Sequence, residues 1–160
     1  MDRRMTKSRC LWGAAAGYLI VAVAALAACG GAPPAALTAG EVKDFAAVCE
    51  KANSGKRVAV EGYLRLPDSF TGDQSVVLRL YKAADFAGAP IGVQVKIGAQ
   101  ANQAERVPKQ YTDRDLKVHL ASGQMIGVGT RVKVSGNVYS PLVSQNFACA
   151  LENPLIELAN

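Results

Sequence analysis

Histidine and tryptophan are nearly absent from this sequence, and so are the motifs of the common catalytic sites. The chain has one of each residue, and only 6% of it is aromatic. Nucleophilic catalysis needs a base beside the nucleophile, but the single His119 falls at an outward strand position and no Gly-x-Ser-x-Gly sequence occurs. The glycine-rich stretch 123–130 lacks the Gly-Lys-Ser/Thr ending of a phosphate-binding loop. We therefore expect His119 to be a surface residue, and we expect no catalytic residue and no cofactor.

Carboxylates are present in the loops, but without the spacing of a known metal site. Asp113 and Asp115 lie near Tyr111, and Asp68 or Asp73 could join them in a weak calcium site. No loop has the spacing of an EF-hand, so we interpret these side chains as solvated loop carboxylates and expect no metal. The pair Asp113 and Asp115 is also the basis of one alternative function, a small hydrolase of the cell envelope.

Residues 1–28 have the pattern of a targeting segment. Cations at positions 3, 4, 7 and 9 precede an uncharged, alanine-rich run from Leu11 to Ala28. The run leads into Leu26-Ala27-Ala28-Cys29, which resembles a bacterial lipobox, where a diacylglyceryl group is attached to the Cys and the preceding residues are removed. The resemblance implies a lipoprotein signal peptide at 1–28 and lipid attachment at Cys29. Two alternatives stay open: a permanent transmembrane anchor, and ordinary signal cleavage after Ala25-Leu26-Ala27.

Removal of this leader would change both the charge and the compartment of the protein. The whole chain has a net charge of +5 and a pI of about 9.1. Residues 29–160 keep fourteen Lys and Arg against twelve Asp and Glu, a net charge of +2. Much of the basicity thus belongs to the targeting signal, which disfavours a nucleic-acid partner. We expect a lipidated tether at 29–37 and a domain at 38–160, anchored to the cell membrane or outer membrane and facing the periplasm or exterior.

Two cysteines remain for the domain once Cys10 and Cys29 are set aside. Cys49 and Cys149 form an even pair in an oxidising compartment, which predicts a disulfide; two buried free thiols are the alternative. A metal site is disfavoured, because only these two cysteines and one histidine are available. Thr38-Ala39-Gly40-Glu41 matches a capping box, so the sequence predicts a helix from about Ala39 to Ala52 with Cys49 on its apolar face.

From Arg57 onward the hydrophobic period changes from that of a helix to that of a strand. Residues 58–64 and 132–138 share the form V-x-V-x-G-x-[LV], with Gly62 and Gly136 at inward positions that predict a bend, bulge or close backbone approach. The polar residues 99–114 predict a long loop. Further alternating segments place apolar residues inward at 76, 78 and 80, at 91, 93, 95 and 97, and at 116, 118 and 120, and a last run, 147–151, breaks at Pro154 before 155–158.

These elements predict a mainly β protein: a small antiparallel β-barrel of five to six strands preceded by one N-terminal α-helix. The strand and glycine pattern over about residues 55–158 resembles an oligonucleotide/oligosaccharide-binding (OB) fold, and is most similar to the tRNA-anti-like OB domains of bacterial lipoproteins. The resemblance implies an OB-like barrel whose ligand face lies on its second and third strands.

On that face the sequence offers Arg79, Tyr81, Gln94 and Lys96 as candidate ligand-binding residues. One aromatic residue and two cations are few for an oligonucleotide platform. We therefore expect a non-enzymatic binding or scaffold module, anchored to the membrane by its N-terminal lipid, whose partner is an envelope protein or polymer. The alternatives are the hydrolase named above and an OB-type oligonucleotide or oligosaccharide binder.

Overall fold

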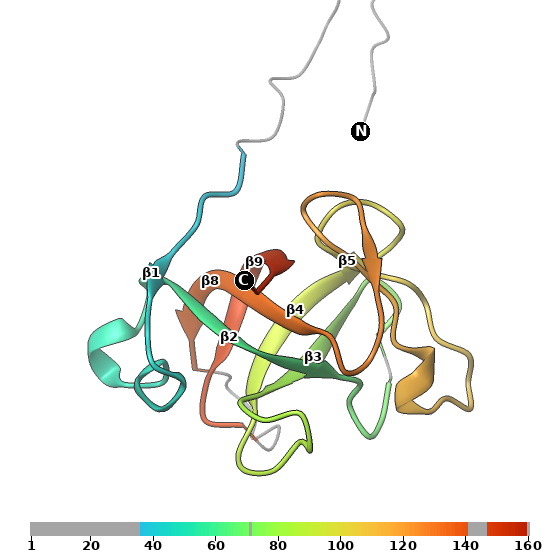
Figure 1. Cartoon of the computed structure of the whole chain (residues 1–160), viewed down its shortest axis with the longest axis horizontal. Coiled ribbons are helices and arrows are strands. Elements are labelled where there is room, and N and C mark those ends of the chain that lie inside the picture. Colours follow the sequence, from blue (N-terminus) through green and yellow to red (C-terminus); the bar gives the residue numbers. More distant parts are fainter. Residues whose placement is uncertain (1–35, 71, 141–146, 160) are drawn as a thin grey trace, which may run out of the picture. The chain divides into compact units, whose positions relative to one another are not determined.

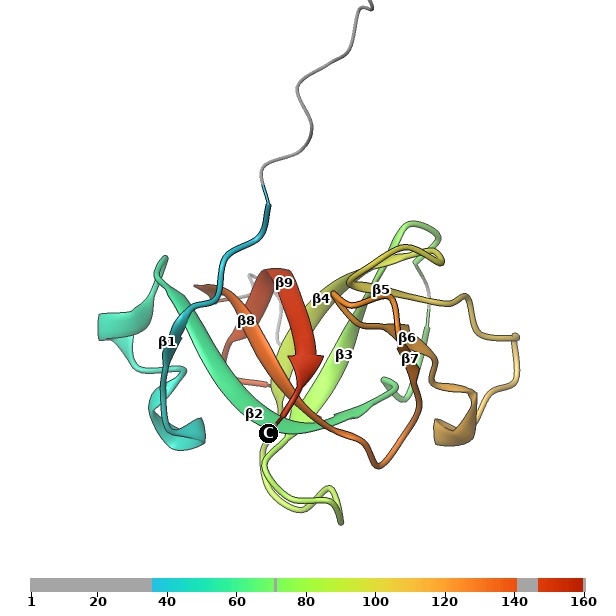
Figure 2. The ribbon, with the colours of Figure 1, turned by 45° about the horizontal axis from the view of Figure 1, so that its top comes forward.

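A closed barrel of five strands forms the body of the protein (Figures 1 and 2). The computed structural model describes residues 36–70, 72–140 and 147–159. The signal peptide 1–28 and the lipid site Cys29 lie outside the described residues, so both stay predictions. The barrel strands are β2 (Arg57–Arg65), β3 (Ser75–Tyr81), β4 (Ile91–Ile97), β8 (Arg131–Tyr139) and β9 (Ala150–Leu158).

The barrel closes in the order β2-β3-β4-β9-β8 and back to β2. Four of these contacts are antiparallel, and the contact between β4 and β9 is parallel. The prediction of a mainly β barrel of five strands is therefore confirmed, and the predicted antiparallel pairing holds at every contact except the one between β4 and β9. Five is an odd number, so strand directions cannot alternate all the way round a closed ring. At least one parallel contact is required, and here it is the one that closes the barrel.

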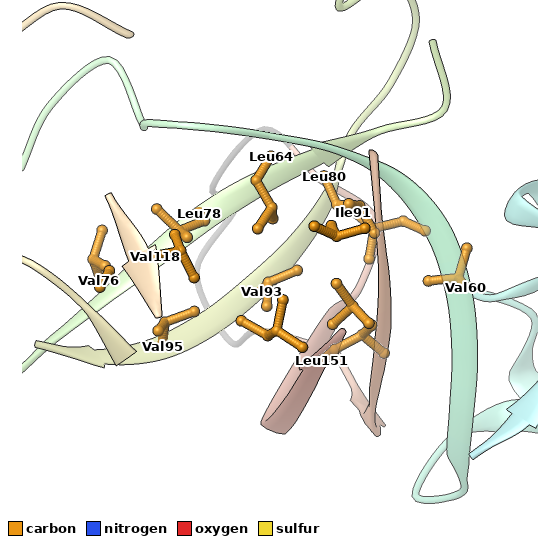
Figure 3. Close-up of a cluster of buried hydrophobic side chains, with 14 of the residues drawn as sticks. Val60, Leu64, Val76, Leu78, Leu80, Ile91, Val93, Val95, Val118 and Leu151 are labelled. Atoms are coloured by element: carbon orange, nitrogen blue, oxygen red, sulfur yellow. The ribbon is translucent and has the colours of Figure 1, made fainter. Parts of the chain in front are cut away.

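The interior of the barrel is filled by aliphatic side chains that alternate along each strand (Figure 3). On β3, Val76, Leu78 and Leu80 are buried, whereas the intervening Val77 and Arg79 are only half-buried. The same alternation was predicted for β4, where the side chain of Ile97 is less buried than expected. A side-chain period of two therefore located the core face of the strands.

Two glycines shape the barrel, as their inward positions predicted. A Cβ on Gly62 in β2 would collide with the carbonyl oxygen of Tyr81. A Cβ on Gly136 in β8 would lie 2.9 Å from the Cβ of Leu151 and 3.0 Å from the carbonyl oxygen of Glu152. Neither position has room for a side chain, so both strands can bend closely against their neighbours.

The expected break at Pro154 is instead a β-bulge within a continuous β9. Ser135 pairs with Leu155, and Asn137 pairs with Glu152, so β9 gains one residue relative to β8. Asn153 takes up the extra length in the left-handed region, with φ of 50°. Asparagine tolerates this conformation better than most residues, and a bulge is one of the few places where a strand accepts proline.

The predicted N-terminal α-helix is wrong. Its residues instead form β1 (Glu41–Val42) and two short 3-10 helices, η1 (Phe45–Ala47) and η2 (Lys51–Asn53). β1 pairs in parallel with β2, the Lys43 amide donates to the Ala59 carbonyl at 2.9 Å, and Gly40 packs directly on the backbone of Val58. Strand pairing with the barrel therefore uses backbone groups that the helix would have needed.

The predicted capping box does not form, because Glu41 and Val42 pair with β2 as a strand and no helix begins here. The carbonyl of Thr38 accepts a hydrogen bond from Arg57 Nε at 2.6 Å. The carboxylate of Glu41 accepts one from Lys43 Nζ at 2.6 Å, and this bond lowers the pKa of Glu41. Tertiary contacts have thus overridden the local helix signal.

The disulfide between Cys49 and Cys149 is confirmed. It joins the turn between η1 and η2 to the residue that precedes β9, across a separation of 100 residues, with the two Cα atoms 5.4 Å apart. Cys149 is 1% exposed and belongs to the core cluster. The bridge therefore holds the N-terminal segment against the barrel by a covalent bond.

Residues between β4 and β8 form a layer over part of the core. They include β5 (Gln103–Ala104), η3 (Asp113–Asp115), β6 (Val118–His119) and β7 (Met125–Ile126). The predicted loop 99–114 thus contains one short strand, and the segment 116–120 is buried at alternate positions as expected. Across the described residues, no helix has the length and apolar character needed to cross a bilayer.

Candidate functional site

A groove of about 330 Å³ lies on the outside of the barrel, beside β3. It is formed by the loop between β2 and β3, the first half of β3 and one residue that precedes β9. Its volume falls at the small end of the range for small-molecule sites. The described residues that line it are Pro67, Asp68, Ser69, Phe70, Gly72, Ser75, Val76, Val77, Arg79 and Phe147.

Arg79 is the one cation among these lining residues. It lies on the outward side of β3, opposite Gly92 on β4, and its side chain is 12% exposed. Its Nη1 donates to Asp68 Oδ1 at 2.7 Å, whereas the Asp68 side chain is 70% exposed. This hydrogen bond holds the pKa of Asp68 below its usual value and raises the pKa of Arg79. The guanidinium is thus stably charged and reaches the groove beside a solvated carboxylate.

Phe147 forms one wall of the groove because β4 has a glycine beneath it. A Cβ on Gly92 would lie 2.7 Å from one carbon of the Phe147 ring and 2.8 Å from the Cβ of Ala150. The absence of a side chain at position 92 therefore lets the ring lie against the sheet. Glycine in a strand commonly marks such a close approach.

The loop after β2, which also lines the groove, is braced by Tyr111. The Tyr111 hydroxyl donates to the carbonyl oxygen of Pro67 at 2.7 Å, and its ring meets Phe70 edge-on with centroids 6.4 Å apart. Burial raises the pKa of the Tyr111 hydroxyl, and the nearby Asp68 charge adds to the effect. These contacts fix Pro67 and Phe70 on either side of Asp68, so the described part of this wall is preorganised.

A second arginine lies directly beside the first. Arg65 on β2 pairs in register with Arg79 on β3. Arg65 Nε donates to Asp113 Oδ2 at 2.8 Å, and its guanidinium lies 5.5 Å from the centroid of Phe86. Phe86 has a φ of 58° and meets Tyr81 edge-on at 5.5 Å. Like charges directly opposite one another destabilise a sheet, and here each guanidinium has its own carboxylate.

The structure places the predicted ligand residues on one face but does not bring them into one site. Arg79 lines the groove. Tyr81 is only 6% exposed and packs against Phe86. Gln94 and Lys96 are exposed on β4, opposite Val77 and Ser75, and Gln94 Oε1 accepts a hydrogen bond from Tyr139 at 3.3 Å.

Sequence reasoning missed three groove residues, Asp68, Phe70 and Phe147. The sequence indicates Asp68 only as a solvated loop carboxylate that could join a weak calcium site, Phe70 only as part of a turn, and Phe147 as the first residue of the last strand. A large apolar residue within a polar turn was the available signal for Phe70. No local signal could have placed Phe147 over Gly92, because that contact depends on the β4–β9 register.

The loop carboxylates considered for catalysis have structural partners. Asp113 pairs with Arg65, and Asp115 Oδ2 accepts hydrogen bonds from the amide and hydroxyl of Thr112 at 2.7 and 3.1 Å. His119 is on the outward side as expected but half-buried, with Nε2 3.2 Å from Glu105 Oε1. Within the described ranges, no group of three or more His, Cys, Asp or Glu side chains could hold a metal ion.

No protein-family model matches this chain, and a search of curated proteins gives no significant match. The candidate site therefore depends on the geometry described above.

Proposed function

We propose that this chain is a lipid-anchored, non-enzymatic binding module of the cell envelope. Its barrel is OB-like, and its ligand binds in the groove beside β3. The observation that carries the proposal is the groove itself, which is lined by a charged arginine and two aromatic side chains, Phe70 and Phe147.

The strand order supports an OB-like barrel. Taken as strands one to five, β2, β3, β4, β8 and β9 are joined in the order one-two-three-five-four, and the barrel closes through a parallel pair. OB folds bind ligands on the face of strands two and three, between the loop joining strands one and two and the loop joining strands four and five. The groove has the same three components: the loop after β2, the outer face of β3, and Phe147 from the connection between β8 and β9.

The start of the chain supports an anchored module. The lipobox-like sequence ends at Cys29, and Arg57 binds the carbonyl of Thr38, so only the eight residues 30–37 lie between these two points. Such a tether spans about 30 Å when fully extended. The disulfide between Cys49 and Cys149 also fits an oxidising compartment outside the cytosol. A lipidated barrel would therefore stay close to the membrane surface, where envelope proteins and polymers are concentrated.

A photo-crosslinking residue placed in the groove tests the binding proposal. Val77 lines the groove and is half-buried, whereas Met125 on β7 is 50% exposed and does not line it. In intact cells, we expect a discrete adduct from position 77 and only background labelling from position 125. Equal labelling at both positions would contradict a ligand in the groove.

The anchor is tested separately by the variant Cys29→Ala. We expect the native protein to fractionate with membranes and to carry an acyl mass on its N-terminal peptide. We expect C29A to lose that mass. Native protein found without acylation, with residues 1–28 still present, would refute the anchor and leave the groove proposal standing.

A further inference from the structure

In the groove, the carboxylate of Asp68 is bound to Arg79 in the way that an anionic ligand would be. Asp68 presents its carboxylate to Arg79 from a loop, at 2.7 Å, inside the hollow that both residues line. A carboxylate or phosphate is what an arginine guanidinium recognises best. Asp68 therefore occupies the position that an anionic group of a ligand would take.

The neighbouring ion pair shows why this one is exchangeable. Arg65 and Arg79 face each other across β2 and β3, and each needs a nearby negative charge. The partner of Arg65, Asp113, has 33% of its side chain exposed and belongs to η3. The partner of Arg79, Asp68, is 70% exposed. An exposed carboxylate is more fully hydrated and loses little on leaving its partner, so Asp68 is the one that a ligand can displace.

The rest of the groove indicates what the anion is attached to. Phe70 and Phe147 supply flat apolar surfaces, and Ser69 and Ser75 supply hydroxyls. Aromatic faces beside hydroxyl groups suit a ring that carries its own hydroxyls. The volume of about 330 Å³ suits a ligand of small-molecule size.

We infer that Asp68 is an internal stand-in for an anionic ligand group, and that the groove binds a ring-bearing anion, such as an acidic sugar unit, by exchanging it for Asp68 on Arg79. This inference rests on the proposed function and adds two things to it, the charge of the ligand and a built-in competitor. The exchange is neutral in charge: one anion leaves the guanidinium as another arrives, and no covalent bond is made or broken.

The test uses three sugars of similar ring size with the protein purified in detergent, with its native N-terminus. D-glucuronate and glucose 1-phosphate carry an anion, and D-glucose does not. Titrations are followed by amide chemical shifts of Ser69, Ser75 and Val77. We expect shifts with one or both anions and none with glucose at the same concentration. The two anionic probes distinguish a carboxylate ligand from a phosphate ligand.

Asp68→Asn and Asp113→Asn form a matched pair of variants. Each removes one negative charge beside one of the two facing arginines, but only Asp68 lines the groove. We expect D68N to bind the anionic probe about two- to fivefold more tightly. The gain in affinity is small because the ion pair that competes with the probe is exposed to solvent and therefore weak. We expect D113N to bind like the native protein, and Arg79→Gln to lose binding while its β8 and β9 amide signals stay in place.

Three results would overturn the inference. Equal gains in D68N and D113N would show a general charge effect in place of exchange. Equal shifts with glucose would show a groove that binds rings without regard to charge, and the proposed binding function would survive. No shift with any probe would also overturn the anion inference, while crosslinking at position 77 would still decide the proposed function.

Discussion

Removing the disulfide between Cys49 and Cys149 should strongly destabilise the domain. The bridge closes a loop of 100 residues. In the chain-entropy treatment such a loop contributes about 4.7 kcal/mol by restricting the unfolded chain. The two Cα atoms are 5.4 Å apart, within the usual range for disulfides, so the folded backbone is not distorted by the bond. The unfolded state therefore carries most of the effect.

The expected change is large enough to measure by thermal and denaturant unfolding. For a domain of this size, the entropy of unfolding converts about 4.7 kcal/mol into a fall of roughly 15–20 °C in Tm. The comparison is between oxidised protein, the single variant Cys49→Ala and the double variant C49A/C149A. Most of the loss should appear in C49A, because either substitution removes the bridge. The double variant adds only the cavity left at the buried Cys149.

The dependence of unfolding on denaturant separates this reasoning from a packing explanation. An unfolded chain without the bridge is more expanded and exposes more surface, so the m-value should rise in both variants. A fall in Tm of only a few degrees, with an unchanged m-value, would refute the argument. That result would mean that the bridge does not restrict the unfolded chain.

Three further predictions follow from contacts elsewhere in the barrel. In urea unfolding, Gly136→Ala should destabilise the domain by about 1–3 kcal/mol, because the added Cβ would collide with β9. Gly127→Ala is the control: its Cβ would lie 3.4 Å from the nearest atom, and its free energy of unfolding should change by no more than about 0.5 kcal/mol. Arg57→Met should remove the hydrogen bonds to three carbonyl oxygens and destabilise the domain by about 1–3 kcal/mol. Hydrogen exchange at the Lys43 amide, which bonds to β2, should become faster. Unchanged exchange at this amide would mean that Arg57 does not hold β1 in place. Burial raises the pKa of Tyr111 in the folded protein, so the neutral hydroxyl contributes to the free energy of unfolding. That contribution is lost as the pH rises through the folded pKa. Tyr111→Phe should therefore lose stability less steeply than the native protein above about pH 10.

The strands could be predicted from the sequence because each one carries its own signal. The alternation of Val76, Leu78 and Leu80 depends only on which face of β3 meets the core. The inward positions of Gly62 and Gly136 in the sequence pattern indicate where side chains are excluded. This information is local: the two-residue period of a strand is the same whichever strands lie beside it.

The N-terminal segment could not be predicted in the same way, because two local structures competed for the same backbone. Thr38 and Glu41 have the spacing of a helix cap, and the apolar residues that follow have helical spacing. The outcome depends on Gly40, which allows this segment to lie directly against Val58 on β2, and on Arg57, which binds the Thr38 carbonyl. Both contacts are made with β2, and the residues that give the helix signal carry no information about that strand.

The groove was only partly predictable for a related reason. Arg79 was placed on the outer face by alternation alone. Asp68 and Phe70 became groove residues through the path of a loop, and Phe147 did so through the register of β9 beside β4. A site made by three distant segments has no contiguous pattern to recognise.

One face of β3 packs in the core and the other lines the groove, and this difference between the two faces gives a final prediction. Leu78 is fully buried, whereas its neighbours Val77 and Arg79 line the groove. Leu78→Ala should cost about 2–5 kcal/mol, because it leaves a cavity in the core. Arg79→Gln should cost no more than about 1 kcal/mol, because the released Asp68 carboxylate is already largely in water.

The two substitutions should therefore separate stability from binding on adjacent residues of one strand. In urea unfolding, L78A should shift the midpoint strongly and R79Q only slightly. In the sugar titrations, R79Q should lose the anionic probe, whereas L78A should keep it at temperatures where the variant remains folded. A large loss of stability in R79Q would show that the arginine is part of the scaffold. The binding phenotype of that variant could then not be attributed to the groove, and D68N would become the decisive variant because it keeps the guanidinium in place.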